Sequence, residues 1–136
     1  MVARDKKLVV LPHRVMKYVD PDRNCPFDIS YVKLRIPYQA AIDQSLRRVE
    51  DGEGVKVKAY SRIGAIVLTY PAKIRIYYGL HDDRTILLFV GTEKRQNKDI
   101  KKAQEDWDEF SEDVEKAENA WQEYLESIEN REEEDE

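Results

Sequence analysis

Three side chains that could do chemistry, Lys73, Arg75 and Tyr77, alternate with Ile74 and Ile76 in the middle of the chain. In a β-strand, this alternation places the two cations and the phenol ring on one face and the isoleucines on the other. A guanidinium on a rigid strand can bind two phosphate oxygens with fixed geometry, and an aromatic ring can stack on a nucleobase. We therefore expect this face to bind a ligand that is negatively charged and flat.

The charge of the chain is divided between a basic body and an acidic C-terminal part. Residues 1–100 hold 19 Lys and Arg against 12 Asp and Glu, a net charge of +7, whereas residues 101–136 hold 4 against 16, a net charge of −12. The overall charge of −5 conceals this division. A basic body is the pattern expected of a protein that binds phosphate groups or an acidic protein partner.

The length and the cysteine content limit which class of protein this can be. The 136 residues are enough for one domain of about 100 residues with an appendage. The single cysteine, Cys25, cannot form an internal disulfide, and one Cys with two distant His gives no metal-ligand spacing. No run approaches the roughly 18 apolar residues of a membrane helix, and residues 1–7 lack the apolar core of a secretion signal. We expect a cytoplasmic protein without a metal, a cofactor or a membrane partner.

The elements that would position the cationic face indicate an α+β domain. Residues 26–52 predict a pair of helices, because Pro26 suits a first helical position, apolar residues recur at helical spacing and Gly52 supplies a stop. One strand precedes this pair, and about four antiparallel strands follow it, with a hairpin at Gly79–Asp83. The helices are expected to cover one face of the sheet, which leaves the opposite face uncovered. The predicted strands are Arg14–Val19, Val55–Tyr60, Ile66–Tyr70, Lys73–Tyr78 and Arg84–Val90.

Apolar residues recur at alternating steps of three and four from Ile100 to Ile128, which predicts one long amphipathic helix. The pattern leaves open whether this seam packs on its own domain or on a helical partner, including a second copy of the chain. We assign residues 1–13 to an N-terminal extension, 14–105 to the domain, and 106–136 to the acidic helix and tail. The acidic tail either folds back onto the cationic face and inhibits binding there, or remains solvated.

Four stretches of the chain are typical of a known family: RVMKYVDPDRNCPF (14–27), LRRVEDGEGVKVKAY (46–60), KIRIYY (73–78) and ILLFVGTEKRQNK (86–98). In the last two, Arg75 precedes a strand tyrosine, and Gly91 precedes the basic pair Lys94 and Arg95. With these motifs and its order of predicted elements, the chain resembles the RelE and ParE toxin superfamily of type II toxin–antitoxin systems. It is most similar to the HigB-like branch, which includes phage proteins. The resemblance covers about residues 14–105.

The resemblance implies an endoribonuclease that cuts messenger RNA, commonly on the ribosome. In this reaction the ribose 2′-hydroxyl attacks its own 3′-phosphate, so neither a metal nor a covalent nucleophile is needed. The implied roles are phosphate stabilisation by Arg75, base catalysis by Lys58 or Lys94, whose pKa would be lowered by neighbouring cations, and stacking or proton donation by Tyr77. RNA phosphate contacts are expected from Lys73, Arg95, Lys98 and His81.

Two other functions remain open. A ParE-like toxin would inhibit DNA gyrase by contact and would need no RNA chemistry. A noncatalytic interaction module would keep the fold and use the C-terminal helix to recruit a partner. Both toxin interpretations imply a small antitoxin protein as partner, and the ribonuclease adds messenger RNA and the ribosome. Dimerisation through residues 100–128 is a further expectation.

Overall fold

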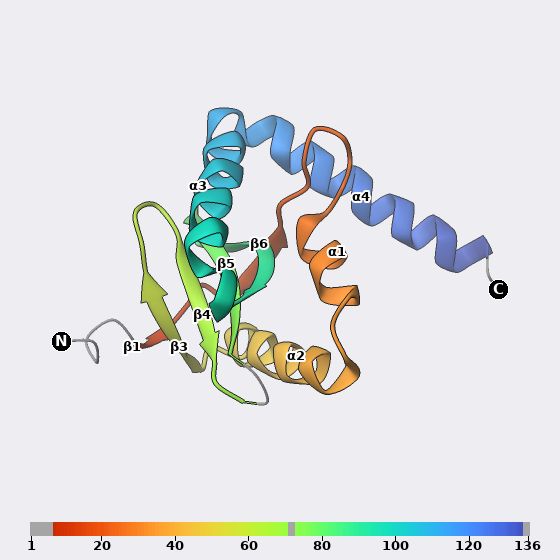
Figure 1. Ribbon diagram of the computed structural model, residues 1–136. Coiled ribbons are helices and arrows are strands. Elements are labelled where there is room, and N and C mark those ends of the chain that lie inside the picture. Colours follow the sequence, from red (N-terminus) through yellow and green to blue (C-terminus); the bar gives the residue numbers. More distant parts are fainter. Residues whose placement is uncertain (1–6, 71–72, 135–136) are drawn as a thin grey trace.

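A six-stranded mixed sheet forms the centre of the structure (Figure 1). The computed structural model describes residues 7–70 and 73–134. Along the sheet the strands follow the order β1-β3-β4-β5-β6-β2, in which β2 runs parallel to β6 and every other neighbouring pair is antiparallel. The strands are β1 (Lys7–Val10), β2 (Arg14–Lys17), β3 (Gly54–Ala59), β4 (Gly64–Leu68), β5 (Ile74–His81) and β6 (Arg84–Thr92).

The α+β class is confirmed, and the sheet differs from the predicted one in two details. The apolar run that we assigned to an N-terminal extension forms β1, which pairs with β3 at one edge. The strand β2 adds to the opposite edge in parallel, so the sheet is mixed. The predicted hairpin is present, and its turn residues Asp82 and Asp83 both have positive φ angles, of 46° and 62°. Such angles fit the tight turns that match the twist of two antiparallel strands.

The predicted pair of helices covers one face of the sheet. The first helix, α1 (Pro26–Val32), begins at Pro26 as expected, and the second, α2 (Ile36–Glu50), has Pro37 in its first turn, where a missing N–H leaves no helical hydrogen bond unmade. Gly52 follows α2 with a φ of +76°, a conformation that favours glycine over other residues. The chain therefore turns sharply into β3.

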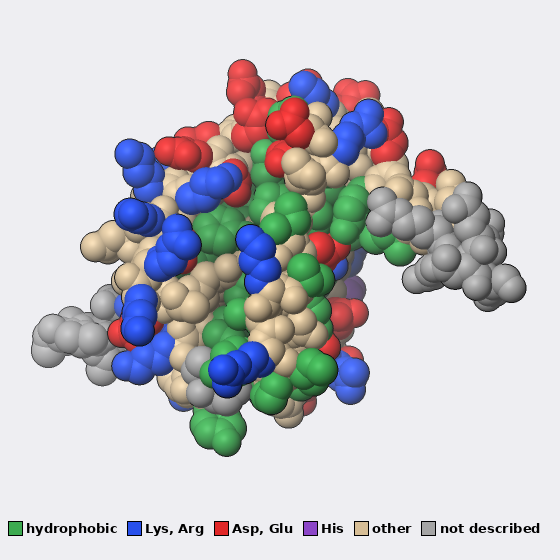
Figure 2. Space-filling model, turned by 45° about the vertical axis from the view of Figure 1, so that its right-hand side comes forward, with side chains coloured by type: hydrophobic (Ala, Val, Ile, Leu, Met, Phe, Trp, Pro, Cys, Tyr) green, Lys and Arg blue, Asp and Glu red, His purple; other side chains and the backbone are tan. Residues whose placement is uncertain are grey.

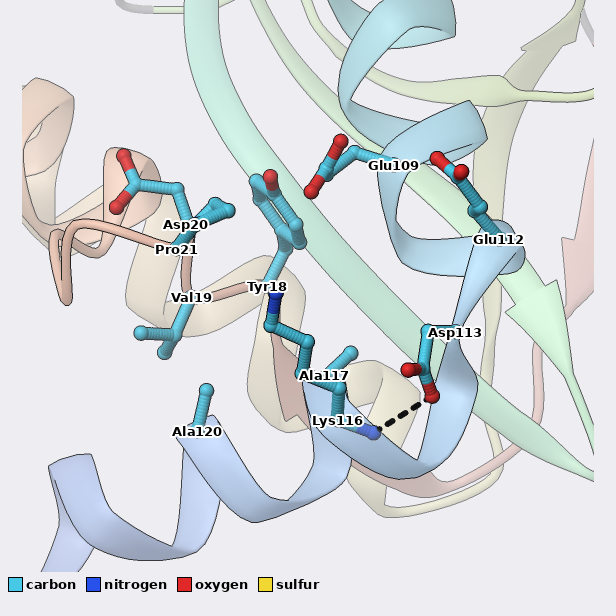
Figure 3. A pocket seen from close by; sticks show the side chains of 10 residues that line it. All are labelled: Tyr18, Val19, Asp20, Pro21, Glu109, Glu112, Asp113, Lys116, Ala117 and Ala120. Carbon is cyan, nitrogen blue, oxygen red and sulfur yellow. Dashed lines mark hydrogen bonds between the residues drawn. The ribbon is translucent and has the colours of Figure 1, made fainter.

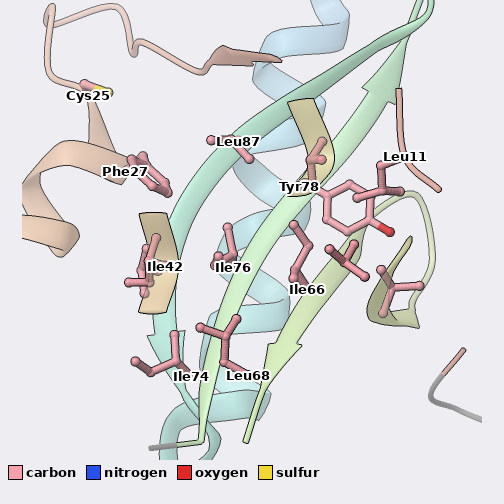
Figure 4. Packing of buried hydrophobic residues seen from close by; sticks show 14 of the residues in the cluster. Leu11, Cys25, Phe27, Ile42, Ile66, Leu68, Ile74, Ile76, Tyr78 and Leu87 are labelled. Carbon is pink, nitrogen blue, oxygen red and sulfur yellow. The ribbon is translucent and has the colours of Figure 1, made fainter. Parts of the chain in front are cut away.

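Alternate side chains of the sheet form a core with α1 and α2 (Figure 4). Tyr78 belongs to this core, as the alternation with Arg75 and Tyr77 predicted. Such burial of large aliphatic side chains supplies about 1.5–3 kcal/mol each. The side chains that meet in this layer include Phe27, Ile42, Ile66, Leu68, Ile74, Ile76 and Leu87.

A third helix, α3 (Gln96–Glu112), covers the other face, so the expectation of an uncovered face is wrong. Figure 1 shows α3 on one side of the sheet and the first two helices on the other. Ala103, Trp107 and Phe110 of α3 form a second core with Tyr77 and other residues of the sheet. The C-terminal seam therefore packs on its own domain over these residues.

Two strand glycines let α3 approach the sheet closely. A Cβ atom at Gly79 would clash with the ring of Trp107, and one at Gly91 would clash with the carboxylate of Asp99. Glycine inside a strand marks places where another element comes near the backbone. The close contact of α3 with β5 and β6 thus depends on these two positions.

The predicted single C-terminal helix is broken at Asp113, which corrects the expectation of one continuous element. After α3 ends, Asp113 has extended backbone angles, and its side chain accepts a hydrogen bond of 3.1 Å from the backbone N–H of Lys116. An aspartate in this position caps the N-terminus of a new helix, α4 (Val114–Glu134). The apolar spacing continues through the break, and for that reason the periodicity did not reveal it.

Candidate nucleic-acid interface

The sheet face under α3 carries the side chains that the strand alternation grouped together. Lys58 of β3 lies opposite Ala65 of β4, and Ala65 lies opposite Tyr77 of β5. Arg75, two residues before Tyr77, shares its face. Tyr77 belongs to the core under α3, whereas Ile74, Ile76 and Tyr78 pack on the opposite side. The structure therefore brings Lys58, Arg75 and Tyr77 to one face of the sheet.

Two of these three side chains are buried. Arg75 is 3% exposed and Tyr77 is 0% exposed, because α3 lies over this part of the sheet. Lys58 remains partly exposed. In this arrangement a nucleic acid does not reach the Arg75 guanidinium or the Tyr77 hydroxyl, which corrects the expectation that both lie on an open surface.

Polar atoms under α3 lack partners in the described parts of the chain. The Tyr60 hydroxyl, Arg75 Nε, the Tyr77 hydroxyl and Asp99 Oδ2 are buried there without a hydrogen bond. Arg75 Nη1 donates to the carbonyl of Ile74 at 3.3 Å. Burial raises the pKa of Tyr77, and the nearby Asp99 and Tyr60 raise it further, while Arg75 lowers it. Holding a guanidinium and hydroxyls away from water without partners costs free energy.

An exposed basic turn leads from β6 into α3. It begins with a short 3-10 helix, η2 (Glu93–Arg95), after which α3 starts at Gln96. Lys94, Arg95 and Lys98 are exposed, and none of them forms an ion pair within the described residues. We call these three residues the basic turn. Lys73, also exposed, lies beside it through an ion pair of 3.2 Å with Glu93.

A cleft of about 580 Å³ opens beside the basic turn, between α1, β6 and α3. Its volume lies in the range of about 300–1,000 Å³ that is typical of small-molecule sites. One wall is formed by α1, and Arg95 of the basic turn lines the cleft as well. Its lining combines apolar, hydroxyl, cationic and acidic side chains, among them Ile29, Ser30, Lys33, Arg95, Lys102, Asp20 and Asp99.

His81 lies at the opposite end of β5 from the basic turn. Eight strand steps separate it from Lys73, a distance of about 25 Å at roughly 3.3 Å per residue. The His81 ring packs edge-on against Phe110, with ring centres 5.8 Å apart, and its Nε2 lies 3.3 Å from a carboxylate oxygen of Asp82. The structure therefore does not bring His81 together with the basic turn, which corrects its place among the expected RNA contacts.

The far end of α3 is acidic. A hollow of about 340 Å³ lies between the loop after β2 and the junction of α3 and α4 (Figure 3). Asp20, Glu109, Glu112 and Asp113 line it together with the ring of Tyr18. Burial raises the pKa of Tyr18, with a further contribution from nearby carboxylates. Carboxylates outnumber cations in this hollow, where Lys116 is the cation of its lining, so a phosphate group is disfavoured there.

The space-filling view displays the same separation of charge. In Figure 2, acidic side chains crowd the top of the visible face, whereas Lys and Arg side chains gather to the left and below. Apolar side chains fill a band between them. Acidic side chains thus predominate at the top of this face and basic ones elsewhere on it, although a few side chains of the other sign occur in each part.

No family model matches the chain, and no curated protein or solved structure is significantly similar to it. The resemblance to the RelE and ParE superfamily therefore stays a prediction. Within the described residues, no helix is both long enough and apolar enough to cross a membrane. A group of three or more His, Cys, Asp or Glu side chains arranged to hold a metal is likewise not found there.

Sequence reasoning did not count Tyr60, Asp99 and Lys33 among the site residues. The alternation with Val55, Val57 and Ala59 placed Tyr60 on the cationic face beside Lys58, but no role was assigned to it. Asp99 lies on the buried face of α3, together with Ala103 and Trp107. A carboxylate at a position where the helical spacing predicts an apolar residue indicates a functional or strained site. Lys33 had no local signal, because only the packing of α1 beside β6 brings it to the cleft.

Proposed function

We propose that the chain binds RNA through the sugar–phosphate backbone at the basic turn, with the adjoining cleft as the place for one nucleotide. One observation carries the proposal: Lys94, Arg95 and Lys98 are exposed together without an ion pair in the described part of the chain. Asp99 lies near Arg95 but forms no ion pair with it, so all three cations remain open to phosphate contacts.

The surroundings of the basic turn favour a phosphate. The turn precedes the N-terminus of α3, a helix of 17 residues, where the helix dipole and free N–H groups attract anions. Lys33 lines the cleft next to it, as does Lys102, which is ion-paired with Asp106. A strand of RNA across the turn would thus meet positive potential along several phosphates, which fits backbone recognition without sequence readout.

The experiment that tests this proposal is the salt dependence of RNA binding. A fluorescein-labelled single-stranded RNA of twelve nucleotides should bind at low salt, and log K should fall with log salt at a slope of roughly −2, about −0.7 for each of three neutralised phosphates. Fluorescence anisotropy measures the slope. A peptide nucleic acid of the same sequence, which has no phosphates, is the control and should not bind. Absence of RNA binding at low salt, or equal binding of the uncharged analogue, would reject the proposal.

Cleavage of the bound RNA, as in a toxin of a type II module with its own antitoxin, is a second candidate function. The polar atoms of Arg75 and Tyr77 that lack partners under α3 favour it, since opening of only the first turn of α3, which carries Asp99, would offer both groups to a phosphate beside Lys58 while Trp107 and Phe110 stay packed. Arg75 would stabilise the phosphorane, and Lys58 or Lys94 would take the proton of the 2′-hydroxyl. A ParE-like gyrase inhibitor or a noncatalytic interaction module would not need the Arg75 guanidinium or the Tyr77 hydroxyl.

Replacement of Arg75 by Met distinguishes a protein that only binds RNA from one that cleaves it. A methionine fills the same space without a buried charge, so the free energy of unfolding should stay unchanged or rise by about 1 kcal/mol. If Arg75 acts on RNA, cleavage of ribosome-bound message should fall by about 10²–10³-fold, as is usual for the loss of a group that stabilises the transition state. Arg47→Met, on the exposed side of α2, makes the same charge change and should leave cleavage intact. Equal cleavage by Arg75→Met and wild type would exclude a catalytic role for Arg75.

Toxicity on expression distinguishes the remaining candidates. An interaction module should be harmless to a sensitive host, and a gyrase inhibitor should cause DNA damage while messenger RNA stays intact. A toxin ribonuclease should truncate messages, and co-expression of a cognate antitoxin should restore growth. Cleaved messages in cells that express the wild type but not Arg75→Met would identify the ribonuclease.

A further inference from the structure

Three large aliphatic side chains are exposed within eight residues at the junction of α1 and α2. Ile29 is 44% exposed, Val32 is 68% exposed and Ile36 is 77% exposed. We call these residues the apolar stripe. Single exposed aliphatic residues are common, but several together on a soluble domain mark a surface that binds a partner. Ile29 also lines the cleft, so the stripe adjoins it.

The helix α4 extends beyond the body of its own domain. Its first part is attached to the domain: Ala117 is buried, Trp121 packs against both cores, and the Tyr124 hydroxyl donates to the carboxylate of Asp28 in α1. After Tyr124 the helix continues for ten residues, about 15 Å at 1.5 Å per residue. Figure 1 shows this part of α4 running past α1 and away from the sheet. We call residues 125–134 the overhang.

The overhang continues the apolar seam of α4 beyond the two cores of the domain. Leu125 and Ile128 lie on the seam after Trp121 and Tyr124, belong to neither core and are partly exposed. The helix around them is acidic, with Glu126 and Glu129 exposed. A helix with one apolar side and carboxylates on the other is suited to a groove that is apolar and rimmed by cations.

We propose that two copies of the chain associate through a twofold exchange in which the overhang of each copy packs on the apolar stripe of the other. The chemistry of the two surfaces is complementary. Lys33 and Arg35 lie within the stripe segment, are exposed, and form no ion pair inside the described ranges. They meet Glu126 and Glu129 of the second overhang, and because Lys33 also lines the cleft, this contact and RNA compete for that side chain. Leu125 and Ile128 then contact Val32 and Ile36.

The exchange satisfies both surfaces in one closed dimer. Because α4 is fixed to α1 through Tyr124 and Asp28, the overhang leaves the domain beside the helix that carries Ile29 and Val32 of the stripe. A twofold axis near α1 therefore lets each copy give its overhang and receive the other, as an isologous interface requires. In this dimer the acidic overhang contacts basic residues of a second copy. The division of charge along the chain had instead suggested that the acidic tail folds back onto its own cationic face.

The test is a charge exchange between two variants, followed by sedimentation at 1–100 µM. Variant one carries Lys33→Glu and Arg35→Glu, and variant two carries Glu126→Lys and Glu129→Lys. We expect the wild type to have twice the mass of the 16.1 kDa chain. Each variant alone should be monomeric, because its own stripe and overhang then carry the same sign. An equal mixture should again give the dimer, since opposite charges meet at both contacts.

Two single variants show whether dissociation is specific to the apolar stripe. Leu80→Glu changes another exposed aliphatic residue, at the end of β5, and should leave the dimer intact, whereas Val32→Glu should dissociate it. Circular dichroism must show that every variant is folded. A wild type that stays monomeric at 100 µM overturns the proposal, as does a mixture of the two charge variants that stays monomeric. Dimers that survive in either charge variant alone would equally contradict the exchange.

Discussion

Replacement of Lys94, Arg95 and Lys98 together by Glu should abolish RNA binding at physiological salt. The triple variant loses three cations at the N-terminal end of α3 and gains three repelling carboxylates, so the affinity for single-stranded RNA should fall by about 10²-fold or more. The slope of log K against log salt should also become less negative, by about 0.7 for each lost phosphate contact. Anisotropy titrations of wild type and variant at several salt concentrations measure both effects.

A matched charge control is needed, because any protein that becomes more acidic repels RNA. Arg14, Arg47 and Lys116 are exposed on β2, α2 and α4, and their joint replacement by Glu changes the net charge by the same amount. This control should retain most of the affinity, since local potential falls off within about 8–10 Å at such salt. Equal loss in the two triple variants would mean that net charge, and not the basic turn, governs binding.

Replacement of Phe110 by Ala should lower the free energy of unfolding by about 3–5 kcal/mol, the usual cost of removing a buried phenylalanine side chain. Phe110 is 0% exposed, its ring stacks on Trp107 with centres 5.1 Å apart, and it touches the ring of His81. A loss of this size is a large part of the stability of an ordinary domain. Urea denaturation followed by tryptophan fluorescence gives the free energy.

The matched control for Phe110 lies on the same apolar seam beyond the body. Ile128 of α4 packs against neither core, so Ile128→Ala should cost less than about 1 kcal/mol in monomeric protein. A small effect of Phe110→Ala would show that α3 is not an integral layer of the domain. Similar large effects of both replacements would show that α4 packs along its whole length.

Because α3 forms part of the second core, a C-terminal truncation cannot test the role of the acidic tail alone. Removal of residues 106–136 would delete Trp107 and Phe110 and leave the second core without its cover. We therefore expect the truncated chain to unfold, with no gain in RNA binding that could be assigned to a freed surface. Experiments on the basic turn need the full chain, and point substitutions are the suitable changes.

The sequence by itself determined the elements and the faces of the strands. Alternation of Arg75 and Tyr77 with Ile74 and Ile76 is a local property of a strand, and so both faces of β5 were predicted correctly. The helical pair and the hairpin likewise depend on neighbouring residues, namely helical spacing, Pro26, Gly52 and the turn after β5. The division of charge along the chain also became a division of the surface.

Only the tertiary structure decided which faces are covered and which charges are accessible. A helical seam shows that a helix has an apolar side, but many apolar surfaces can accept it, so the docking of α3 on the sheet could not be derived from spacing alone. That docking buries Arg75 and Tyr77 and leaves the basic turn exposed. Burial results from contacts between residues distant in sequence. The reason for glycine at positions 79 and 91 is visible only in the folded structure, where Trp107 and Asp99 lie against them.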